Sequence, residues 1–330
     1  MRGIVATHAS NFHCDDVSAS VLLGYTNLYR HHRLIRTLDP IELNRCDLVF
    51  DIGGVYDPDT NRYDHHQKGF VETYSSQHTI RLSSCGLIYK HFGKEIIANV
   101  IDFIDPFGEK LTADQLSWLE LKIYNSFIIA IDANDNGIDP YDGTPLFRDS
   151  TTLPARVAKL NSKGNGMLRM EQFMKAQELV RSEFIEFFSA IYFKVIPSLP
   201  PVSDVFKTRE KYDAEGRILV FKNKCNWRDF LEDLETEEAL KTGKLRQVLY
   251  VVSFDDTRGQ WGCIAVPIAQ GSFKMRKPFP LPWRGLRDEK MSEVTGVEGS
   301  VFTHNSGFLC CHKTYDGMLK LTQLACAFKD

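Results

Sequence analysis

Short apolar runs alternate with helical segments at the start of this chain, and this alternation limits the fold more than any other feature. Strands are expected at residues 4–7, 33–37 and 48–51, with a helix at 15–29 and a short helix at 40–44. Strands that alternate with helices favour right-handed βαβ units. The sequence therefore predicts an α/β fold with a mostly parallel sheet in this half of the chain.

Histidines and aspartates follow two of these strands. His8, His13 and Asp15 fall in the loop after the first strand, and Asp51 closes the third. Because open α/β sheets bind ligands at the carboxyl ends of their strands, we expect these side chains to lie together. Asp51 could reach two cations, one through each carboxylate oxygen. Mixed His and Asp ligands without a thiolate favour Mn²⁺ or Mg²⁺ over Zn²⁺, so the sequence predicts two divalent cations, with Mn²⁺ preferred.

Two later segments offer further ligands for the same edge of the sheet. Asp64-His65-His66 follows Asp51 after a turn that is short enough to fold back over this edge. A long helix expected at 112–132 ends at Asp132, which could supply one more oxygen. Asp135 lies three residues on and on the same helical face, so the choice between these two aspartates stays open. A bare carboxylate is unfavourable at a helix C-terminus, which favours a compensating cation here.

The rest of the chain suggests a second domain. Helices are expected at 82–92 and 170–191, and a proline-rich stretch then gives the best linker candidate because proline stiffens a chain and ends helices. The pattern beyond it is richer in strands, which are expected at 218–221, 248–254, 263–268 and 300–304, before a final helix at 316–328. We therefore expect a metal-binding catalytic domain at 1–196, a linker at 197–204 and a smaller α/β substrate-binding domain at 205–330.

A local basic segment lies in this second domain. Between Ser272 and Arg287 the chain carries five cations and no acid, with aromatic residues between them. Cations beside stacking rings suit a groove for single-stranded nucleic acid, although a proline-rich surface loop with solvated charges would show the same pattern. His304 and Ser306 follow a strand and could touch a phosphate or ribose, or form a plain turn. The substrate-binding candidates are Lys274, Arg276, Lys277, Trp283, Arg284, Arg287, His304 and Ser306.

The bulk composition is that of an ordinary globular protein. The formal net charge is −3, so no global positive field would hold nucleic acid. The eight cysteines contain no Cys-x-x-Cys pair and suit reduced thiols in an intracellular protein. No apolar run approaches the roughly 18–20 residues of a membrane span. The N-terminus enters its first strand at once, which leaves no room for a signal peptide and favours a cytoplasmic location.

Several motifs, spread almost from end to end, give the chain a family resemblance. They are Thr7–Asp15, Asp51–Gly54, Tyr63–Gln67, Leu82–Tyr89, Asp132–Gly137, Trp283–Asp288 and Phe302–Phe308. On these residues the chain resembles the MYG1 (UPF0160) family of the DHH phosphoesterase superfamily. The resemblance implies a DHH-type N-terminal domain and a two-metal phosphodiester hydrolase, namely a 3′→5′ exonuclease acting on single-stranded RNA or short oligonucleotides. It also implies a mitochondrial or nuclear location.

The resemblance further implies roles for individual residues. His8, His13 and Asp51 would bind one metal, and the second metal would be bound by Asp15, Asp51, His65 and Asp132. His66 would face the scissile phosphate, and Asp64 would hold the tautomer of His65. The catalytic set is then Asp51, Asp64 and His66, with in-line attack by a metal-bridging hydroxide.

Two departures from the family pattern bear on the substrate. His13 stands where the wider superfamily more often has Asp, and Cys310-Cys311 stands where relatives tend to carry Gly-Gly. Glycines let a backbone approach a phosphate closely, so the cysteines could reshape that contact. Two other functions therefore stay open. One is a small-molecule phosphoesterase, such as a pyrophosphatase or cyclic-dinucleotide phosphodiesterase, and the other is a non-catalytic metal-binding regulator.

Overall fold

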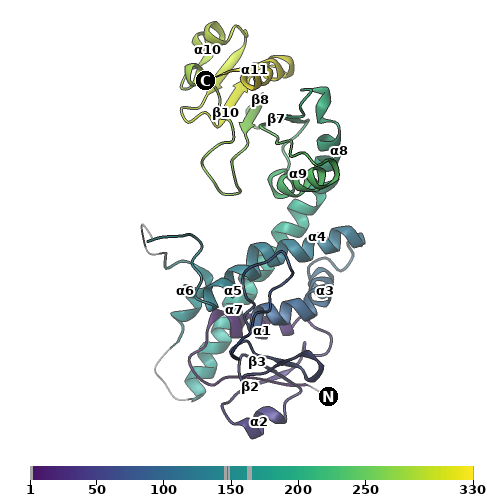
Figure 1. Cartoon of the computed structure of the whole chain (residues 1–330), viewed down its shortest axis with the longest axis vertical. Helices are drawn as coiled ribbons and strands as arrows, with labels where there is room; N and C mark the ends of the chain where they lie inside the picture. Colours follow the sequence, from purple (N-terminus) through teal and green to yellow (C-terminus); the bar gives the residue numbers. More distant parts are fainter. Residues whose placement is uncertain (1–2, 145–146, 148, 162–165, 330) are drawn as a thin grey trace. The chain divides into compact units, whose positions relative to one another are not determined.

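The computed structural model describes residues 3–144, 147, 149–161 and 166–329. The chain forms two compact units, Met1–Tyr192 and Phe193–Asp330. Each unit has its own five-stranded sheet (Figure 1).

The sheet of the first unit is mostly parallel, as the sequence predicts. Its strand order is β2-β1-β3-β5-β4, and only the edge strand β4 runs antiparallel to its neighbour. The strands are β1 (Ile4–Thr7), β2 (Arg33–Arg36), β3 (Leu48–Phe50), β4 (Tyr56–Asp57) and β5 (Arg62–Tyr63). The carboxyl ends of β1, β3 and β5 therefore meet at one edge of the sheet.

Helices cover both faces of this sheet. The short helix α2 (Pro40–Asn44) packs on one face through Leu43, against Ala6 and Val49. The helix α1 (Cys14–Leu23) is buried along its whole length, because α3 and α7 pack against it. The other helices of the unit are α3 (Ser84–Ile104), α4 (Ala113–Ile123), α5 (Ile129–Asp135), α6 (Leu153–Ala158) and α7 (Gly166–Ala190), with 3₁₀ turn η1 (Pro58–Thr60) and π-helix η2 (Tyr124–Ile128).

Several helix boundaries in this unit differ from the sequence prediction, and the helix expected at 82–92 is α3, which extends to Ile104. The helix expected at 15–29 ends at Leu23, since Gly24 begins a turn. The helix expected at 112–132 consists of α4 and α5 with the π-helix η2 between them. A π-helical turn carries an extra residue per turn, so it changes the face on which the following side chains lie.

The second unit is a smaller α/β unit whose sheet has the order β6-β7-β8-β10-β9. Only β6 and β7 are parallel neighbours. The strands are β6 (Ile218–Phe221), β7 (Tyr250–Asp255), β8 (Gln260–Ala265), β9 (Ser300–Thr303) and β10 (Leu309–His312). The helices are α8 (Leu199–Lys207), α9 (Arg228–Thr242), α10 (Asp288–Thr295) and α11 (Tyr315–Ala327), and the 3₁₀ turns are η4 (Ile196–Ser198), η5 (Arg209–Lys211) and η6 (Leu281–Trp283). The π-helix η3 (Ile191–Val195) includes residues of both units.

The core of this unit lies between α11 and one face of the sheet. Met318 and Leu321 of α11 pack there with Cys263, Cys310 and other buried residues of the strands. The stretch 197–204, expected to be a linker, is helical instead. Pro197 lies in a 3₁₀ turn, and Pro200 and Pro201 fall in the first turn of α8, where a missing N–H group removes no helical hydrogen bond. Within the described residues, every helix is too short or too polar to cross a membrane.

Candidate metal centre

Asp51 lies at the centre of a cluster of histidines and aspartates. It follows β3 directly and adopts a left-handed backbone conformation, with φ at 58°, which few residues other than glycine tolerate. Its buried carboxylate contacts two histidines from different loops: Oδ2 lies 3.2 Å from Nε2 of His8, and Oδ1 lies 3.4 Å from Nε2 of His65. Burial opposes ionisation, but the hydrogen bonds from His65 and His8 lower the pKa of Asp51. Asp51 therefore joins the β1–α1 loop to the Asp-His-His segment.

The first turn of α1 adds two completely buried carboxylates, Asp15 and Asp16. Asp16 accepts a hydrogen bond from the backbone N–H of His13 at 2.8 Å through Oδ1, and its Oδ2 lies 3.3 Å from Nε2 of His8. Burial lowers the pKa of His8, but hydrogen bonds to Asp16 and Asp51 outweigh it and raise that pKa to about 9. In this arrangement the imidazole is paired with two carboxylates.

Asp15 shows directly that the cluster suits cations. Neither of its carboxylate oxygens finds a hydrogen-bond donor among the described residues. Burial, followed by the charges of Asp51 and Asp135, raises the pKa of Asp15 well above its usual value. An unpaired buried carboxylate costs several kcal/mol, and a divalent cation removes that cost. The donor set of imidazoles and carboxylates is the one that Mn²⁺ and Mg²⁺ accept.

Asp135, rather than Asp132, completes the cluster. Its Oδ2 lies 3.2 Å from Nε2 of His65, and its Oδ1 lies 4.0 Å from Nδ1 of His13. Three groups of candidate ligands result, each with ligand atoms within 4.8 Å of one another, and the first two share Asp51: Asp51, Asp64, His65 and His66; His8, Asp16 and Asp51; His13, Asp15 and Asp135. The structure thus brings together the predicted ligands His8, His13, Asp15, Asp51 and His65.

The prediction of Asp132 as a ligand is wrong for this structure. Its Oδ1 accepts hydrogen bonds from the backbone N–H and the hydroxyl of Ser83, at 2.9 and 2.7 Å. Its Oδ2 accepts a hydrogen bond from the hydroxyl of Tyr124 at 3.1 Å. The carboxylate therefore faces the start of α3, whereas Asp135, one helical turn further on, faces the histidines.

The role expected for Asp64 is also corrected. Its Oδ1 lies 2.7 Å from Nδ1 of the ring of His66 and bonds His65 through the backbone N–H alone. Its Oδ2 accepts from the backbone N–H of Gly54 at 2.5 Å. The hydrogen bond from Asp64 raises the pKa of His66, whose side chain is 62% exposed. Asp64 therefore orients His66 and leaves the ring of His65 to Asp51 and Asp135.

Two residues of the site were missed in the sequence. Asp16 directly follows the predicted ligand Asp15, and its place as the third residue of a helix capped by His13 is a signal that was available. Ser84, the first residue of α3, donates its hydroxyl to Oδ1 of Asp51 at 3.3 Å. No pattern in the sequence distinguishes this serine from a helix cap.

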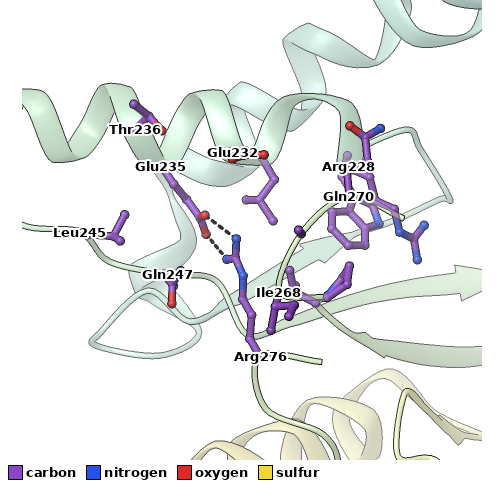
Figure 2. Close-up of a pocket in the computed structure, with 14 residues that line it drawn as sticks. Arg228, Glu232, Glu235, Thr236, Leu245, Gln247, Ile268, Gln270 and Arg276 are labelled. Carbon is purple, nitrogen blue, oxygen red and sulfur yellow. Dashed lines mark hydrogen bonds and ion pairs between the residues drawn. The ribbon is translucent and has the colours of Figure 1, made fainter. Parts of the chain in front are cut away.

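In the second unit, half of the eight predicted substrate contacts are structural. Arg276 forms a two-point ion pair with the buried Glu235, with N–O distances of 2.6 and 2.9 Å, in the wall of a pocket (Figure 2). Lys277 donates to the backbone carbonyls of Cys326 and Phe328, both at 2.8 Å. Two of the five cations expected to line a groove along 272–287 are therefore used inside the fold.

The remaining members of the predicted substrate set divide in two. Trp283 is buried in the core, and Arg284 donates through Nε to the backbone carbonyl of Phe279. Lys274, Arg287 and Ser306 are exposed and His304 is partly exposed. The guanidinium of Arg287 lies 4.3 Å from the ring centre of Phe302, and the rings of His304 and Phe308 are 4.6 Å apart. Charged and aromatic groups do meet here, but through a smaller set of residues.

The fold and the cluster define the class of the protein: an α/β protein whose parallel sheet gathers imidazoles and carboxylates suited to divalent metal binding. The chain matches the family model MYG1_exonuc, described as "Uncharacterised protein family (UPF0160)", over residues 4–326. The chain belongs to this family, which confirms the resemblance noted in the sequence.

Relatives in distant organisms support the assignment. The human protein "MYG1 exonuclease" is 36% identical over 332 residues, covering 98% of this chain and 85% of its own length. The Dictyostelium discoideum "MYG1 protein" is 36% identical over 321 residues, covering 96% of this chain and 94% of its own. Among solved structures, RecJ from Thermus thermophilus in complex with Mn²⁺ matches with 10% identity and a TM-score of 0.23, covering 100% of this chain and 52% of the other. A TM-score this low supports no conclusion about the chain.

Proposed function

We propose that this protein is a metal-dependent phosphodiester hydrolase that removes nucleotides from the 3′ end of single-stranded RNA. The observation that carries this proposal is the position of Asp51 between His8 and His65, beside the unpaired carboxylate of Asp15. A relative that shares the full length of the chain is named an exonuclease. Buried charges of this kind destabilise a fold unless cations balance them, so we do not expect the cluster in a protein where it has no function.

Two cations, with Mn²⁺ favoured and Mg²⁺ also suited, would share Asp51. His8 and Asp16 lie on one side of this carboxylate, and His65, with Asp135 beyond it, lies on the other. Asp15 and His13 complete the set near Asp135. When bound, a pair of neighbouring cations lowers the pKa of water and stabilises the charge on the entering and leaving oxygens of a phosphodiester.

His66 supplies a contact to the substrate from this chain itself. Its Nδ1 is held by Asp64, so its Nε2 is the nitrogen that can donate to a phosphate oxygen. The hydrogen bond to Asp64 raises the pKa of His66, which shifts the ring toward the protonated form that binds an anion. The side chain is largely exposed, as a contact to an incoming phosphate requires.

In the second unit, we assign RNA contact to the exposed Arg287 and the partly exposed Phe302, His304 and Phe308, with Lys274 and Ser306 as further exposed candidates. A guanidinium over an aromatic ring and an imidazole beside another combine phosphate neutralisation with base stacking. These contacts do not depend on base identity, which suits an enzyme that degrades RNA of varied sequence.

The test uses metal-stripped protein supplied with Mn²⁺ or Mg²⁺ and a panel of substrates: RNA labelled at its 5′ end, the same RNA blocked at its 3′ end, single-stranded DNA, pyrophosphate and a cyclic dinucleotide. We expect a ladder of shortened 5′-labelled products that needs metal and disappears when the 3′ end is blocked. Turnover confined to pyrophosphate or the cyclic dinucleotide would establish a small-molecule phosphoesterase instead. Mn²⁺ binding without turnover of any substrate would favour a metal-binding regulator.

A further inference from the structure

We propose that Asp132 is a positioning residue, which holds two ligand-bearing segments of the metal centre in place without contacting a cation. The inference rests on the proposed function only in taking the His and Asp cluster to bind divalent cations. It does not depend on which phosphoester is hydrolysed.

Both oxygens of the Asp132 carboxylate accept hydrogen bonds from groups of the protein itself. It is completely buried, accepts from the backbone N–H and hydroxyl of Ser83, and accepts from the hydroxyl of Tyr124. Its oxygens lie so close to Gly86 that a Cβ there would overlap both of them. The carboxylate thus occupies the N-terminus of α3, where free backbone N–H groups and the helix dipole favour a negative charge.

Through α3, this contact reaches one side of the metal centre. Ser83 is the residue that precedes the first turn of α3, and Ser84 donates its hydroxyl to Oδ1 of Asp51 at 3.3 Å. Since the two serines are adjacent, a displacement of Ser83 moves the donor to Asp51. The side chain of Ser83 makes no cap hydrogen bond to its own helix and instead donates to Asp132. The start of α3 therefore depends on Asp132 for its position.

Through α5, the same residue reaches the other side. Asp135 lies one turn after Asp132, and its Oδ2 is 3.2 Å from Nε2 of His65. The same nitrogen is 3.4 Å from Oδ1 of Asp51. The contacts form a closed ring. Asp132 bonds Ser83, whose neighbour Ser84 bonds Asp51. Asp51 and Asp135 both contact His65, and α5 connects Asp135 back to Asp132. Asp132 is the link that joins the two helices.

Tyr124 holds the second oxygen of this link. It lies in the π-helix before α5, is buried, and stacks on Tyr74 with ring centres 3.8 Å apart. A stacked ring restricts the position of its hydroxyl, so the hydrogen bond to Asp132 is directed by packing. Tyr124 thus fixes Oδ2 of Asp132, while Ser83 bonds the other oxygen, Oδ1.

The test measures Mn²⁺ binding to metal-stripped protein by titration calorimetry, which needs no RNA. Groups that orient ligands typically change metal affinity by about 10–100-fold while the ions still bind. We therefore expect Asp132→Asn to keep the wild-type number of bound Mn²⁺ ions but to bind them about 10–100-fold more weakly. Asp135→Asn, the matched control three residues on, should lose one ion. Loss of an ion in Asp132→Asn, or unchanged affinity, would overturn the proposal.

A second set of variants tests the geometry and keeps the proposal testable if Asp132→Asn does not fold. Tyr124→Phe removes one hydrogen bond from the carboxylate and preserves the ring stack, so it should weaken Mn²⁺ binding without changing the number of ions. Gly86→Ala places a methyl group against the carboxylate and should lower both affinity and melting temperature. In an Asp132→Ala background the methyl group at position 86 has room. Gly86→Ala should therefore lower Mn²⁺ affinity and melting temperature much less there.

Three outcomes separate this inference from the proposed function. The losses of Mn²⁺ affinity and melting temperature in Gly86→Ala and in Asp132→Ala should not simply add in the double variant. Simple addition would contradict the close contact between Gly86 and Asp132 on which the inference rests. Wild-type protein that binds Mn²⁺ but cleaves no RNA would remove the proposed function and leave the inference standing. Wild-type protein that binds no Mn²⁺ would remove both.

Discussion

The carboxylate of Asp64 lies 2.7 Å from Nδ1 of the His66 ring, although the ring of His65 is one residue nearer along the chain. This pairing separates the two histidines chemically. His65 turns its Nε2 to Asp51 and Asp135, as a metal ligand would, and His66 remains largely exposed with a raised pKa. The Asp-His-His segment thus supplies one side chain to the cations and one to the substrate.

Replacing Asp64 with Asn should slow hydrolysis and leave metal binding intact. The amide oxygen can still accept from a backbone N–H, but it provides no charge to hold a protonated His66. We expect kcat to fall about 10–100-fold with an unchanged number of bound Mn²⁺ ions, measured by single-turnover cleavage and calorimetry. A variant that loses an ion would show that Asp64 ligates metal directly.

Asp51→Asn should remove nearly all activity. The change removes the charge that two histidines, and in our proposal two cations, share. We expect kcat/KM for RNA to fall about 100-fold or more, because loss of a shared ligand exceeds the loss of a supporting one. Asp59→Asn, an exposed aspartate in the same connection, is the matched control and should keep wild-type activity. Near-normal turnover by Asp51→Asn would refute the shared-ligand role.

Metal removal should destabilise the first unit. Asp15 and Asp16 are completely buried, and the oxygens of Asp15 find no donor among the described residues. Binding of Mn²⁺ to the folded state alone adds about 2.7 kcal/mol of stability at a concentration 100 times its Kd. Melting curves should therefore shift upward with Mn²⁺ concentration. A melting temperature that changes neither with chelator nor with Mn²⁺ would show that the cluster holds no cation.

Asp132 should make the stability of metal-free protein depend on pH. Burial raises the pKa of this carboxyl to about 7, above its usual value, while hydrogen bonds from Ser83 and Tyr124 oppose the shift. A raised folded-state pKa stabilises the fold at low pH, and that contribution is lost as the pH rises to the folded value. Between pH 4 and 7, wild type should therefore lose up to about 4 kcal/mol relative to Asp132→Asn, and no more above pH 7. Denaturant unfolding in chelator measures this difference, and a constant offset across pH would contradict the shift.

Arg276→Ala should unfold the second unit more readily and leave RNA affinity of the folded protein unchanged. The change leaves the buried carboxylate of Glu235 without its cation, which costs about 3–5 kcal/mol. Arg287→Ala, at an exposed position beside Phe302, should do the reverse: weaker RNA binding with a normal melting temperature. Thermal unfolding and a filter-binding assay on both variants distinguish the structural cation from the substrate contact.

Local signals were enough to predict several elements of the fold and the edge of the sheet that carries the site. The bounds of β1, α2 and β6 agree with the residues expected from the sequence, and the histidines and aspartates after β1 and β3 do meet at one edge. These features depend on the alternation of strands with helices and on where each strand ends. Both can be recognised from residues that are close together in the sequence.

The errors arise where the deciding contact is distant in the sequence. Arg276 pairs with Glu235, 41 residues away, and Lys277 bonds the carbonyl of Cys326, 49 residues away. A run of cations therefore has the same appearance whether its charges face solvent or are used inside the fold. The sequence left the choice between Asp132 and Asp135 open for a related reason, because the π-helix before α5 sets which of them faces the histidines. Prolines at the start of α8 are as typical of a helix N-terminus as of a linker.

The backbone of Asp51 also restricts how this position can evolve. Glutamate would keep the charge but does not favour the left-handed conformation, and asparagine would keep the conformation but lose the charge. Each single replacement therefore fails one of two independent requirements. Descendants of this protein that abandon the chemistry would lose only the requirement for charge, so we expect asparagine or glycine, which tolerate the left-handed backbone, to replace this aspartate.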